Sequence, residues 1–205
     1  MIDRLDHQTN HDPHELLGRR EQLARLVRLD TPFSQVVSSW AGFGVHGEQT
    51  TPTSFVDLTD DDARLLDLPA GTSVTRRDIH LVSVLTEPVF RAAAITELVY
   101  EPRLGLDLAG RRAVRSGSDP LDSLVNHLRR VVCYVLRPHH ATEGDTADDP
   151  QPDHPALQAK TILAHAGIPV AVAVETVYWR LIAHRQPSVV LPYAMPRPLL
   201  ARMSR

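Results

Sequence analysis

Two adjacent arginines lie in the middle of a β-rich run, SVTRRDIHL, at residues 73–81. A planar guanidinium binds a carboxylate through two parallel hydrogen bonds, so an arginine in this position suits recognition of an anion. Because side chains alternate between the two faces of a strand, Arg76 and Arg77 point to opposite sides and only one can face the interior. We predict Arg77 as the anion-binding residue. The alternative is that both arginines are solvated or pair with Asp78 and other nearby acids.

A further arginine and two glutamates lie in other apolar, β-rich runs. Arg91, in VFRAAAI, would be costly to bury without an anion, so it either belongs to the same pocket or forms a salt bridge with Glu97 or Glu175. These glutamates lie in ITELVY and VAVETVYW, where apolar surroundings raise the pKa of a carboxyl group and suit it to act as an acid near neutral pH. Glu97 and Glu175 are therefore the candidate catalytic residues, unless they lie on the solvated face of a half-buried strand.

Aromatic and histidine side chains supply the remaining candidates. Tyr178 and Tyr193 could line a pocket for a ring-shaped ligand, although aromatic residues in a hairpin are also common core residues. His80 and His184, on or beside expected strands, are acid–base candidates. The other histidines cluster in polar segments that cannot fix a coordination geometry. We therefore predict no metal site and no cofactor.

Composition limits the function classes. The chain has 205 residues, 42% of them hydrophobic and 23% charged, which fits one domain with a full core. A net charge of −3 argues against nucleic acid as a direct partner. No apolar run approaches the length that spans a bilayer, so we expect a soluble, cytoplasmic protein without a membrane partner. The oligomeric state is left open.

The single cysteine, Cys133, lies in RRVVCYVL and excludes an internal disulfide bond. Its apolar neighbours favour a buried, packed side chain over a reactive thiol.

The elements follow from hydrophobic periodicity and from turn residues. We expect a mobile segment at 1–14 and then a single domain over 15–205, with a polar loop at 138–155 that is disordered or, as the alternative, a lid. The expected helices cover residues 13–29, 32–38, the turn TDDDARLL, 118 to about 131, and ALQAKTILAHAG. The expected strands are PTSFVDL, a hairpin over 73–100, a strand from about 131, and a closing hairpin over 170–196. The predicted fold class is α+β, an antiparallel sheet built from sequential hairpins with helices packed on one face.

The order of TRRDIHL with EPVF, then SDPLDSLV, then YWRLIAHRQPSVVLPYAMPRPLL resembles the chorismate pyruvate-lyase family. The fold of that family is shared with the UTRA ligand-binding domains of bacterial transcription regulators. The segment LLDLPAGTSVTRRDIHLVS by itself is at least as similar to a UTRA domain. The resemblance covers roughly residues 50–200 through short, discontinuous motifs.

The resemblance implies removal of pyruvate from chorismate to leave 4-hydroxybenzoate, without metal or organic cofactor, in a site closed off from water. Arg77 matches the arginine that clasps the aromatic carboxylate, and the segment around Leu121 matches the one that offers backbone amides. The family's second pocket arginine falls on Ala93, although Arg91 lies on the same strand face. The family's acid falls on Pro192, which has neither charge nor proton to give.

Two hypotheses follow. The first is a cofactor-free enzyme of chorismate lyase-like fold that acts on a small carboxylated organic substrate, by the lyase reaction or by a diverged reaction of secondary metabolism. In it, Glu97 or Glu175 replaces the missing acid, and the substrate-binding residues are Arg77, Arg91, Leu121, Tyr178 and Tyr193. The alternative is a non-catalytic, UTRA-like module that binds a small molecule.

Overall fold

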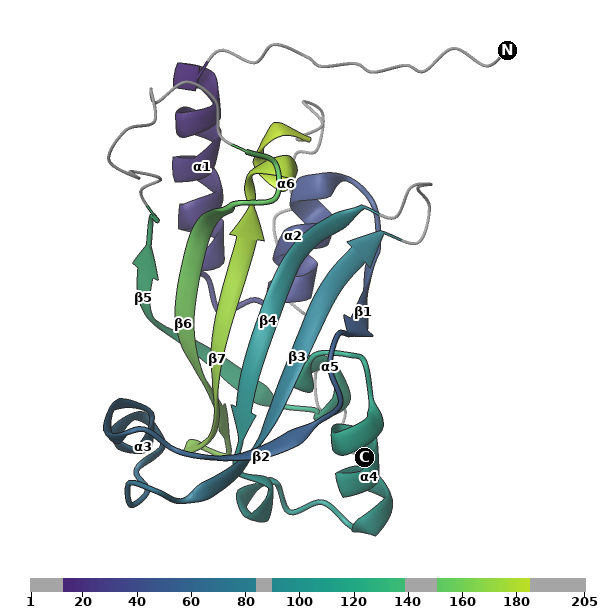
Figure 1. Ribbon diagram of the computed structural model, residues 1–205, viewed down its shortest axis with the longest axis vertical. Helices are drawn as coiled ribbons and strands as arrows, with labels where there is room; N and C mark the ends of the chain where they lie inside the picture. The colour runs from purple at the N-terminus through teal and green to yellow at the C-terminus, as the bar shows by residue number, and fades with distance from the viewer. Residues whose placement is uncertain (1–12, 84–89, 139–150, 185–205) are drawn as a thin grey trace, which may run out of the picture.

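The computed structural model describes residues 13–83, 90–138 and 151–184 (Figure 1). In this part of the chain seven strands form one antiparallel sheet in the order β1-β3-β4-β7-β6-β5, and β2 pairs with the other end of β3. The strands are β1 (Val45–Gln49), β2 (Ser54–Asp57), β3 (Ser73–Ser83), β4 (Arg91–Val99), β5 (Leu128–Leu136), β6 (Pro155–His165) and β7 (Ile168–Tyr178).

Six α-helices and one 3-10 helix are described beside the sheet. They are α1 (Pro13–Val27), α2 (Phe33–Ala41), α3 (Asp60–Leu66), η1 (Glu101–Leu104), α4 (Leu108–Ser116), α5 (Leu121–Leu124) and α6 (Trp179–Ala183). The predicted α+β class is therefore confirmed, with antiparallel pairing throughout the described sheet.

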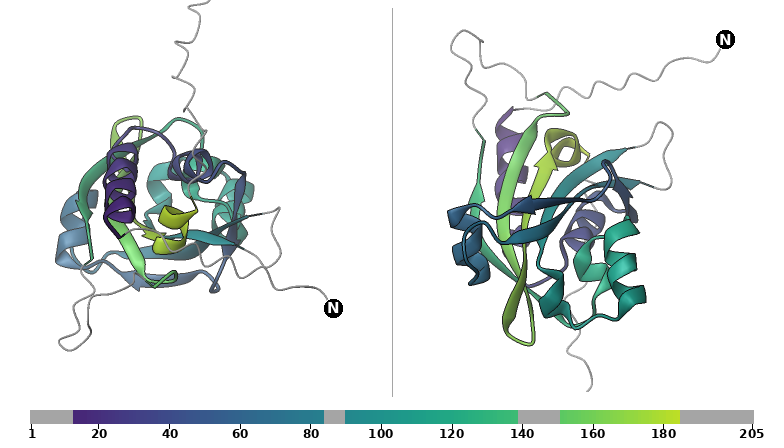
Figure 2. Two further views of the ribbon diagram at one scale, coloured as in Figure 1. Left: turned by 90° about the horizontal axis from the view of Figure 1, so that it is seen from above. Right: turned by 60° about the horizontal axis from the view of Figure 1, so that its bottom comes forward.

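The main core lies on one face of the sheet (Figures 1 and 2). Helices α1, α2 and α6 cover one end of this face and enclose the largest apolar cluster, which includes Phe33, Trp40 and Trp179. Helices α4 and α5 cover the other end, where Val114 and Leu121 meet apolar side chains of β4, β6 and β7. Helix α3 packs against the opposite face, over β3 and β7, so the expectation that the helices pack on one face is corrected. The two ends of the main face therefore have separate coverings, and the second covering carries the site.

Local sequence explains where the shorter helices begin. Thr59 precedes α3, and its hydroxyl accepts a hydrogen bond from the Asp62 amide. Asp107 precedes α4, and its carboxylate accepts from the Gly110 amide at 2.7 Å. Such side chains satisfy amides that have no partner within the helix. Both helices therefore begin at a capping residue.

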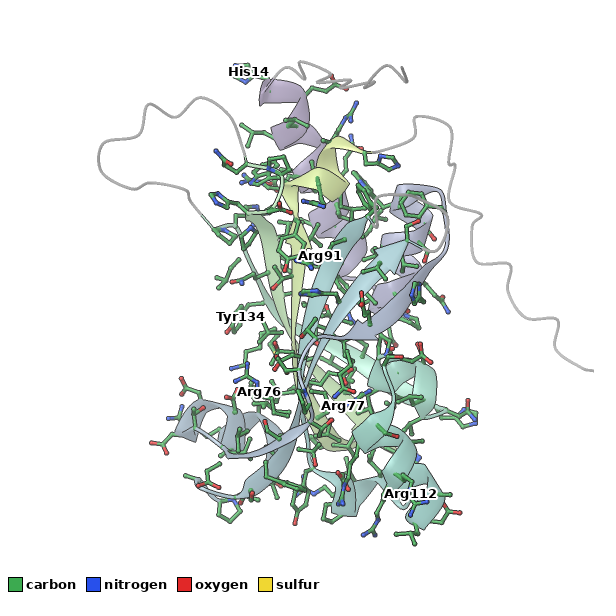
Figure 3. All side chains as sticks on the ribbon, turned by 45° about the vertical axis from the view of Figure 1, so that its right-hand side comes forward. His14, Arg76, Arg77, Arg91, Arg112 and Tyr134 are labelled. Carbon is green, nitrogen blue, oxygen red and sulfur yellow. The ribbon has the colours of Figure 1, made fainter. Side chains whose placement is uncertain are left out.

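Strand β3 alternates as its sequence predicts. Arg76 is exposed and Arg77 is 1% exposed, and Figure 3 shows the two side chains leaving the strand in opposite directions. Arg76 pairs with Asp78 at 3.0 Å on the outer face. The inward residue is therefore Arg77.

Several expectations about elements were wrong. Residues ALQAKTILAHAG form most of strand β6, not a helix. Buried and half-buried residues alternate over 157–163, as a strand requires. The sequence is rich in Ala, Leu, Gln and Lys, which favour helices, so its composition indicated the wrong element. The helix expected from residue 118 is the short α5, because the chain turns at His127, which has a positive φ of 64°, and enters β5. Residues 179–183, expected to continue the closing hairpin as a strand, form helix α6. Helix α4 and strand β1 were not predicted.

Cys133 is exposed, so the expectation of a buried cysteine is corrected. It lies in edge strand β5, where the register with β6 shifts between Val132 and Tyr134. Apolar neighbours in the sequence do not bury a side chain at a strand edge, because β5 has a partner strand on one side only.

Some expectations fall outside the described residues. These are the mobile segment up to residue 12, the loop at 139–150, and the second half of the closing hairpin with Pro192 and Tyr193. Within the described ranges, the helices are all too short or too polar to cross a membrane.

Candidate functional site

The predicted anion-binding arginine lies beside one of the predicted acids. Arg77 and Glu97 are direct cross-strand partners of β3 and β4, and the Arg77 Nη1 donates to Glu97 Oε2 at 2.5 Å. The other oxygen, Oε1, accepts from the Leu121 amide at 2.8 Å. Both side chains are fully buried, so this is an interior ion pair closed by the start of α5. Burial raises the pKa of Glu97 to about 7, although Arg77 and the Leu121 amide act in the opposite direction.

Arg77 also holds the chain that follows α4. Its Nη2 donates to the carbonyl oxygens of Gly117 at 2.9 Å and Asp119 at 2.6 Å. The Nε of Arg77 is buried without a hydrogen-bond partner among the described residues. The guanidinium therefore joins β3, β4 and the segment 117–121 at one point.

A second buried ion pair lies on the same sheet face. Arg130 of β5 donates through Nε to Glu175 Oε1 at 2.7 Å, and its Nη2 donates to the other Glu175 oxygen. Its Nη1 donates to the carbonyl oxygens of Val27 and Leu29 at 2.7 and 2.9 Å, which fixes the end of α1. Burial raises the pKa of Glu175, although the hydrogen bonds from Arg130 oppose the rise. Both predicted catalytic glutamates are thus held by arginines.

The remaining predicted residues lie elsewhere. Arg91 is exposed at the start of β4, at the far end of the sheet from Arg77, and is electrostatically coupled to Tyr178 at the end of β7. Neither Glu97 nor Glu175 pairs with Arg91. His184 packs against the rings of Phe43 and Phe90, and its burial lowers its pKa. The structure therefore unites Arg77, Glu97 and Leu121, and separates them from Arg91 and Tyr178.

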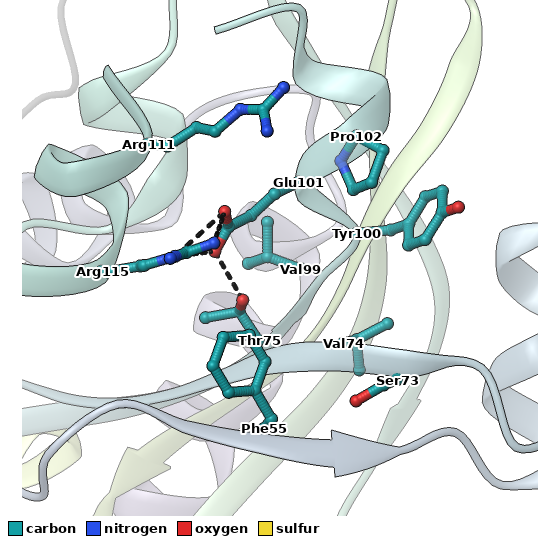
Figure 4. Close-up of a pocket in the computed structure, with 10 residues that line it drawn as sticks. All are labelled: Phe55, Ser73, Val74, Thr75, Val99, Tyr100, Glu101, Pro102, Arg111 and Arg115. Atoms are coloured by element: carbon teal, nitrogen blue, oxygen red, sulfur yellow. Dashed lines mark hydrogen bonds and ion pairs between the residues drawn. The ribbon is translucent and has the colours of Figure 1, made fainter. Parts of the chain in front are cut away.

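A hollow of about 320 Å³ opens beside the buried Arg77–Glu97 pair (Figure 4). It lies between strands β2, β3 and β4, the 3-10 helix η1 and helix α4. Its apolar wall includes Phe55, Val74, Val99, Tyr100 and Pro102. Phe55 is 65% exposed and so offers an accessible aromatic ring at this wall. The volume is of the size that holds a small organic molecule.

Arginines of α4 form the polar side of the hollow. Arg115 donates to both oxygens of Glu101, through Nε at 2.9 and 3.1 Å and through Nη2 at 2.8 Å, and lies 5.4 Å from the Phe55 ring centre. The Thr75 hydroxyl also donates to Glu101, at 2.6 Å. Burial alone would raise the pKa of Glu101, but the hydrogen bonds from Arg115 and Thr75 lower it. This carboxylate is therefore ionised, and its oxygens already accept hydrogen bonds from Arg115 and Thr75.

Arg111 differs from Arg115 in its partners. Its Nε donates to the Leu106 carbonyl at 3.2 Å, and no carboxylate of the described chain lies within ion-pair distance of its guanidinium. A second hollow, of about 510 Å³, adjoins the first and shares Arg111 and Arg115 with it. Arg112 and Ser116 line this second hollow. Arg111 acts on Glu101 at longer range and helps to lower the pKa of that carboxyl. The α4 face therefore presents two guanidiniums, those of Arg111 and Arg112, without an ion-pair partner in the described chain.

The chemical capacity of the hollow is binding of an anion with an apolar body. None of its ten lining residues is His, Cys or Lys, and its one carboxylate is held by Arg115 and Thr75. Within the described ranges, no group of three or more His, Cys, Asp or Glu side chains is placed to hold a metal ion.

Sequence reasoning missed Arg130 and the three arginines of α4. Arg130 could have been found by the alternation that was applied to Arg76 and Arg77, since Arg129 and Arg130 open a β-rich run in the same way. The sequence indicates the α4 arginines more weakly. Asp107 and Gly117 are typical residues at the start and end of a helix, and they flank AGRRAVR.

Comparison with known proteins gave matches at the level of structure only. The sequence matches no model of a known protein family and no curated protein. Among solved structures, the effector domain of PhnF from Mycobacterium smegmatis is similar, with 11% identity, a TM-score of 0.47, and coverage of 71% of this chain and 87% of that one.

Two further structures belong to proteins assigned to the GntR family of transcriptional regulators. The ligand-binding domain from Bordetella bronchiseptica has 16% identity and a TM-score of 0.45, over 65% of this chain and 83% of that one. The regulator from Enterococcus faecalis V583 has 8% identity and a TM-score of 0.40, over 64% and 92%. The Mycobacterium smegmatis and Bordetella bronchiseptica structures are an effector domain and a ligand-binding domain, and all three TM-scores lie below 0.5. The resemblance to chorismate lyase stays a prediction.

Proposed function

We propose that the chain is a non-catalytic module that binds a small carboxylated molecule in the hollow beside α4. The observation that carries this proposal is the guanidinium of Arg111, which has no ion-pair partner in the described chain, next to an exposed Phe55 and an apolar wall. A carboxylate paired with Arg111 and an apolar body against Phe55 would satisfy both. Arg115, held in place by Glu101, lines the site and adds its positive charge to the electrostatic attraction of the carboxylate.

Binding is favoured over catalysis because the acids near the site are occupied. Glu97 and Glu175 are each hydrogen-bonded to an arginine, and Glu101 is held by Arg115 and Thr75. A general acid must place its proton within reach of the substrate. The hollow offers no free carboxyl or imidazole group for this role in the described chain.

The test is a calorimetric titration with benzoate, which has a ring and a carboxylate that is ionised at neutral pH. Arg111→Ala should weaken binding about tenfold or more, because a charge-assisted contact is lost. The matched control is Arg64→Ala, an exposed arginine of α3 that lies outside the hollow. Equal affinity of the two variants would refute the assignment of the site.

A second measurement separates a binding module from an enzyme. The full chain is incubated with chorismate, and release of 4-hydroxybenzoate is followed by absorbance. We expect chorismate to be recovered unchanged. Release that depends on Glu97 or Glu175 would instead support the lyase hypothesis.

A further inference from the structure

The C-terminal end of α4 is anchored to the interior by charge. Directly after the helix, the carbonyl oxygens of Gly117 and Asp119 accept from Arg77, and the Leu121 amide donates to Glu97. Strand β1 packs closely on the same segment: a Cβ on Gly47 would lie 2.0 Å from the Ser118 carbonyl oxygen. The segment 117–121 thus lies between β1 and the Arg77–Glu97 pair.

Apolar packing does little to orient α4. Val114 is the buried residue of this helix, and the flanking arginines and Leu108 are exposed. The other ties are polar: the Thr53 hydroxyl donates to the Arg115 carbonyl at 2.5 Å, and the Arg115 side chain meets Glu101. A helix with a single buried side chain depends on its end contacts for its position.

We infer that Arg77 and Glu97 are positioning residues for the anion-binding face of α4, and that benzoate-like anions bind more weakly when Glu97 is protonated. The inference rests on the proposed function, because it concerns the same Arg111 site. Neither residue touches the hollow, so they act through the segment 117–121.

Protonation of Glu97 weakens its present contacts. Each carboxylate oxygen accepts from a donor, Oε2 from Arg77 and Oε1 from the Leu121 amide. A proton would take a lone pair that neither donor uses, and both contacts would then end on a neutral carboxyl group. A hydrogen bond to an ionised group is roughly twice as strong as a neutral one, so both contacts weaken.

Burial favours uptake of a proton by Glu97, and the charges around it act in both directions. Arg77 faces it from β3, Asp122 raises its pKa from α5, and the Glu175–Arg130 pair lies on β7 and β5. These five groups comprise three carboxyls and two guanidiniums, so the fully ionised set carries one excess negative charge. The pKa of about 7 that burial gives Glu97 places this step within the neutral range.

The experiment has two arms, and the first needs no ligand. Amide hydrogen exchange of Leu121 and α4 is measured at pH 6 and pH 8 and corrected for the intrinsic pH dependence of exchange. In the wild type, protection should be higher at pH 8. Glu97→Gln, which carries an amide in place of the ionised group, should show the lower protection at both pH values. Equal protection in the wild type at the two pH values would overturn the inference.

The second arm is benzoate affinity, since benzoate stays ionised over this range. The wild type should bind about fivefold more weakly at pH 6 than at pH 8, and Glu97→Gln should bind weakly and without pH dependence. The matched control is Glu175→Gln, the same substitution in a buried pair that does not contact 117–121; it should retain the wild-type pH profile.

The outcomes separate the two proposals. If benzoate binds at neither pH, the proposed function fails, and amide exchange still decides the inference. If Glu97→Gln keeps the wild-type pH profile, or if Glu175→Gln abolishes it, the positioning role is wrong. Should Glu97→Gln fail to fold, the pH profiles of benzoate binding by the wild type and by Glu175→Gln are compared. A profile that Glu175→Gln abolishes would refute the positioning role, and a profile that it retains would support it.

Discussion

Replacement of Gly47 by alanine tests the contact between β1 and the segment that follows α4. Gly47 is buried in β1, and a Cβ there would lie 2.0 Å from the carbonyl oxygen of Ser118, 2.8 Å from its carbonyl carbon and 3.0 Å from the Asp119 Cα. All three atoms belong to backbone, so no side-chain rotation can relieve the clash. The segment has to move away from β1 by about 1.5 Å to reach ordinary van der Waals separation.

The cost follows from the contacts that this movement disturbs. Arg77 donates to the carbonyl oxygens on both sides of Ser118, those of Gly117 and Asp119, at 2.9 and 2.6 Å. A hydrogen bond to a charged group contributes about 1.5–3 kcal/mol, so loss of one or two gives a destabilisation of about 2–5 kcal/mol. Alanine also restricts the unfolded chain, which offsets about 0.4–1 kcal/mol of this cost.

Urea denaturation of Gly47→Ala against Gly44→Ala isolates the clash. A Cβ on Gly44 meets no atom within 4 Å, so this variant carries the unfolded-state effect alone and should differ little from the wild type. The free energy of unfolding of Gly47→Ala should be lower than that of Gly44→Ala by at least about 2 kcal/mol. Equal stability of the two variants would refute the close packing of β1 on 117–121, and with it the anchoring of α4.

Two further predictions concern buried or half-buried charge. Arg130→Ala leaves the Glu175 carboxylate buried without its partner and should cost about 3–5 kcal/mol in urea denaturation, whereas Arg130→Met with Glu175→Leu should cost less; an equal cost would contradict the ion-pair argument. The pKa of Glu101 is lower in the folded protein than its ordinary value of 4.5, so its contribution to stability is present above pH 4.5 and is lost as pH falls further. Glu101→Gln should therefore flatten the acid limb of a thermal-unfolding profile, and an unchanged acid limb would argue against the Arg115–Glu101 contact.

The fold class could be predicted because β3, β4 and the capped helices carry local signals. Arg76 and Arg77 alternate as a strand requires, and Thr59 marks the start of α3. Strand β6 was misread because its sequence is rich in Ala, Leu, Gln and Lys, which favour helices, and its pairing with β5 and β7 overrides that preference. Such errors come from tertiary context that a local pattern does not contain.

The candidate site was predicted only in its interior part. The β-rich context of Arg77 and Glu97 indicated that both could be buried, but their pairing depends on the register of β3 and β4, which the sequence does not state. The hollow depends on how α4, η1 and β2 come together, and these elements meet across more than fifty residues of chain. Arg111 becomes notable only once the structure shows which arginines already have an acid.

The carboxylate that Arg77 meets in this structure is that of Glu97. Its two oxygens accept hydrogen bonds from Arg77, which the chorismate lyase resemblance assigns to the ligand carboxylate, and from the Leu121 amide, in the segment that it assigns to the ligand. A ligand carboxylate could reach these donors only if Glu97 moved aside, and the displaced side chain would then need to be protonated or to find another cation in a buried region. A role for Arg77 as a ligand clamp therefore remains a prediction that requires displacement of Glu97, whereas Arg111 requires none. This difference in cost is the reason to place the ligand at α4 and to assign the buried pair the task of holding that helix.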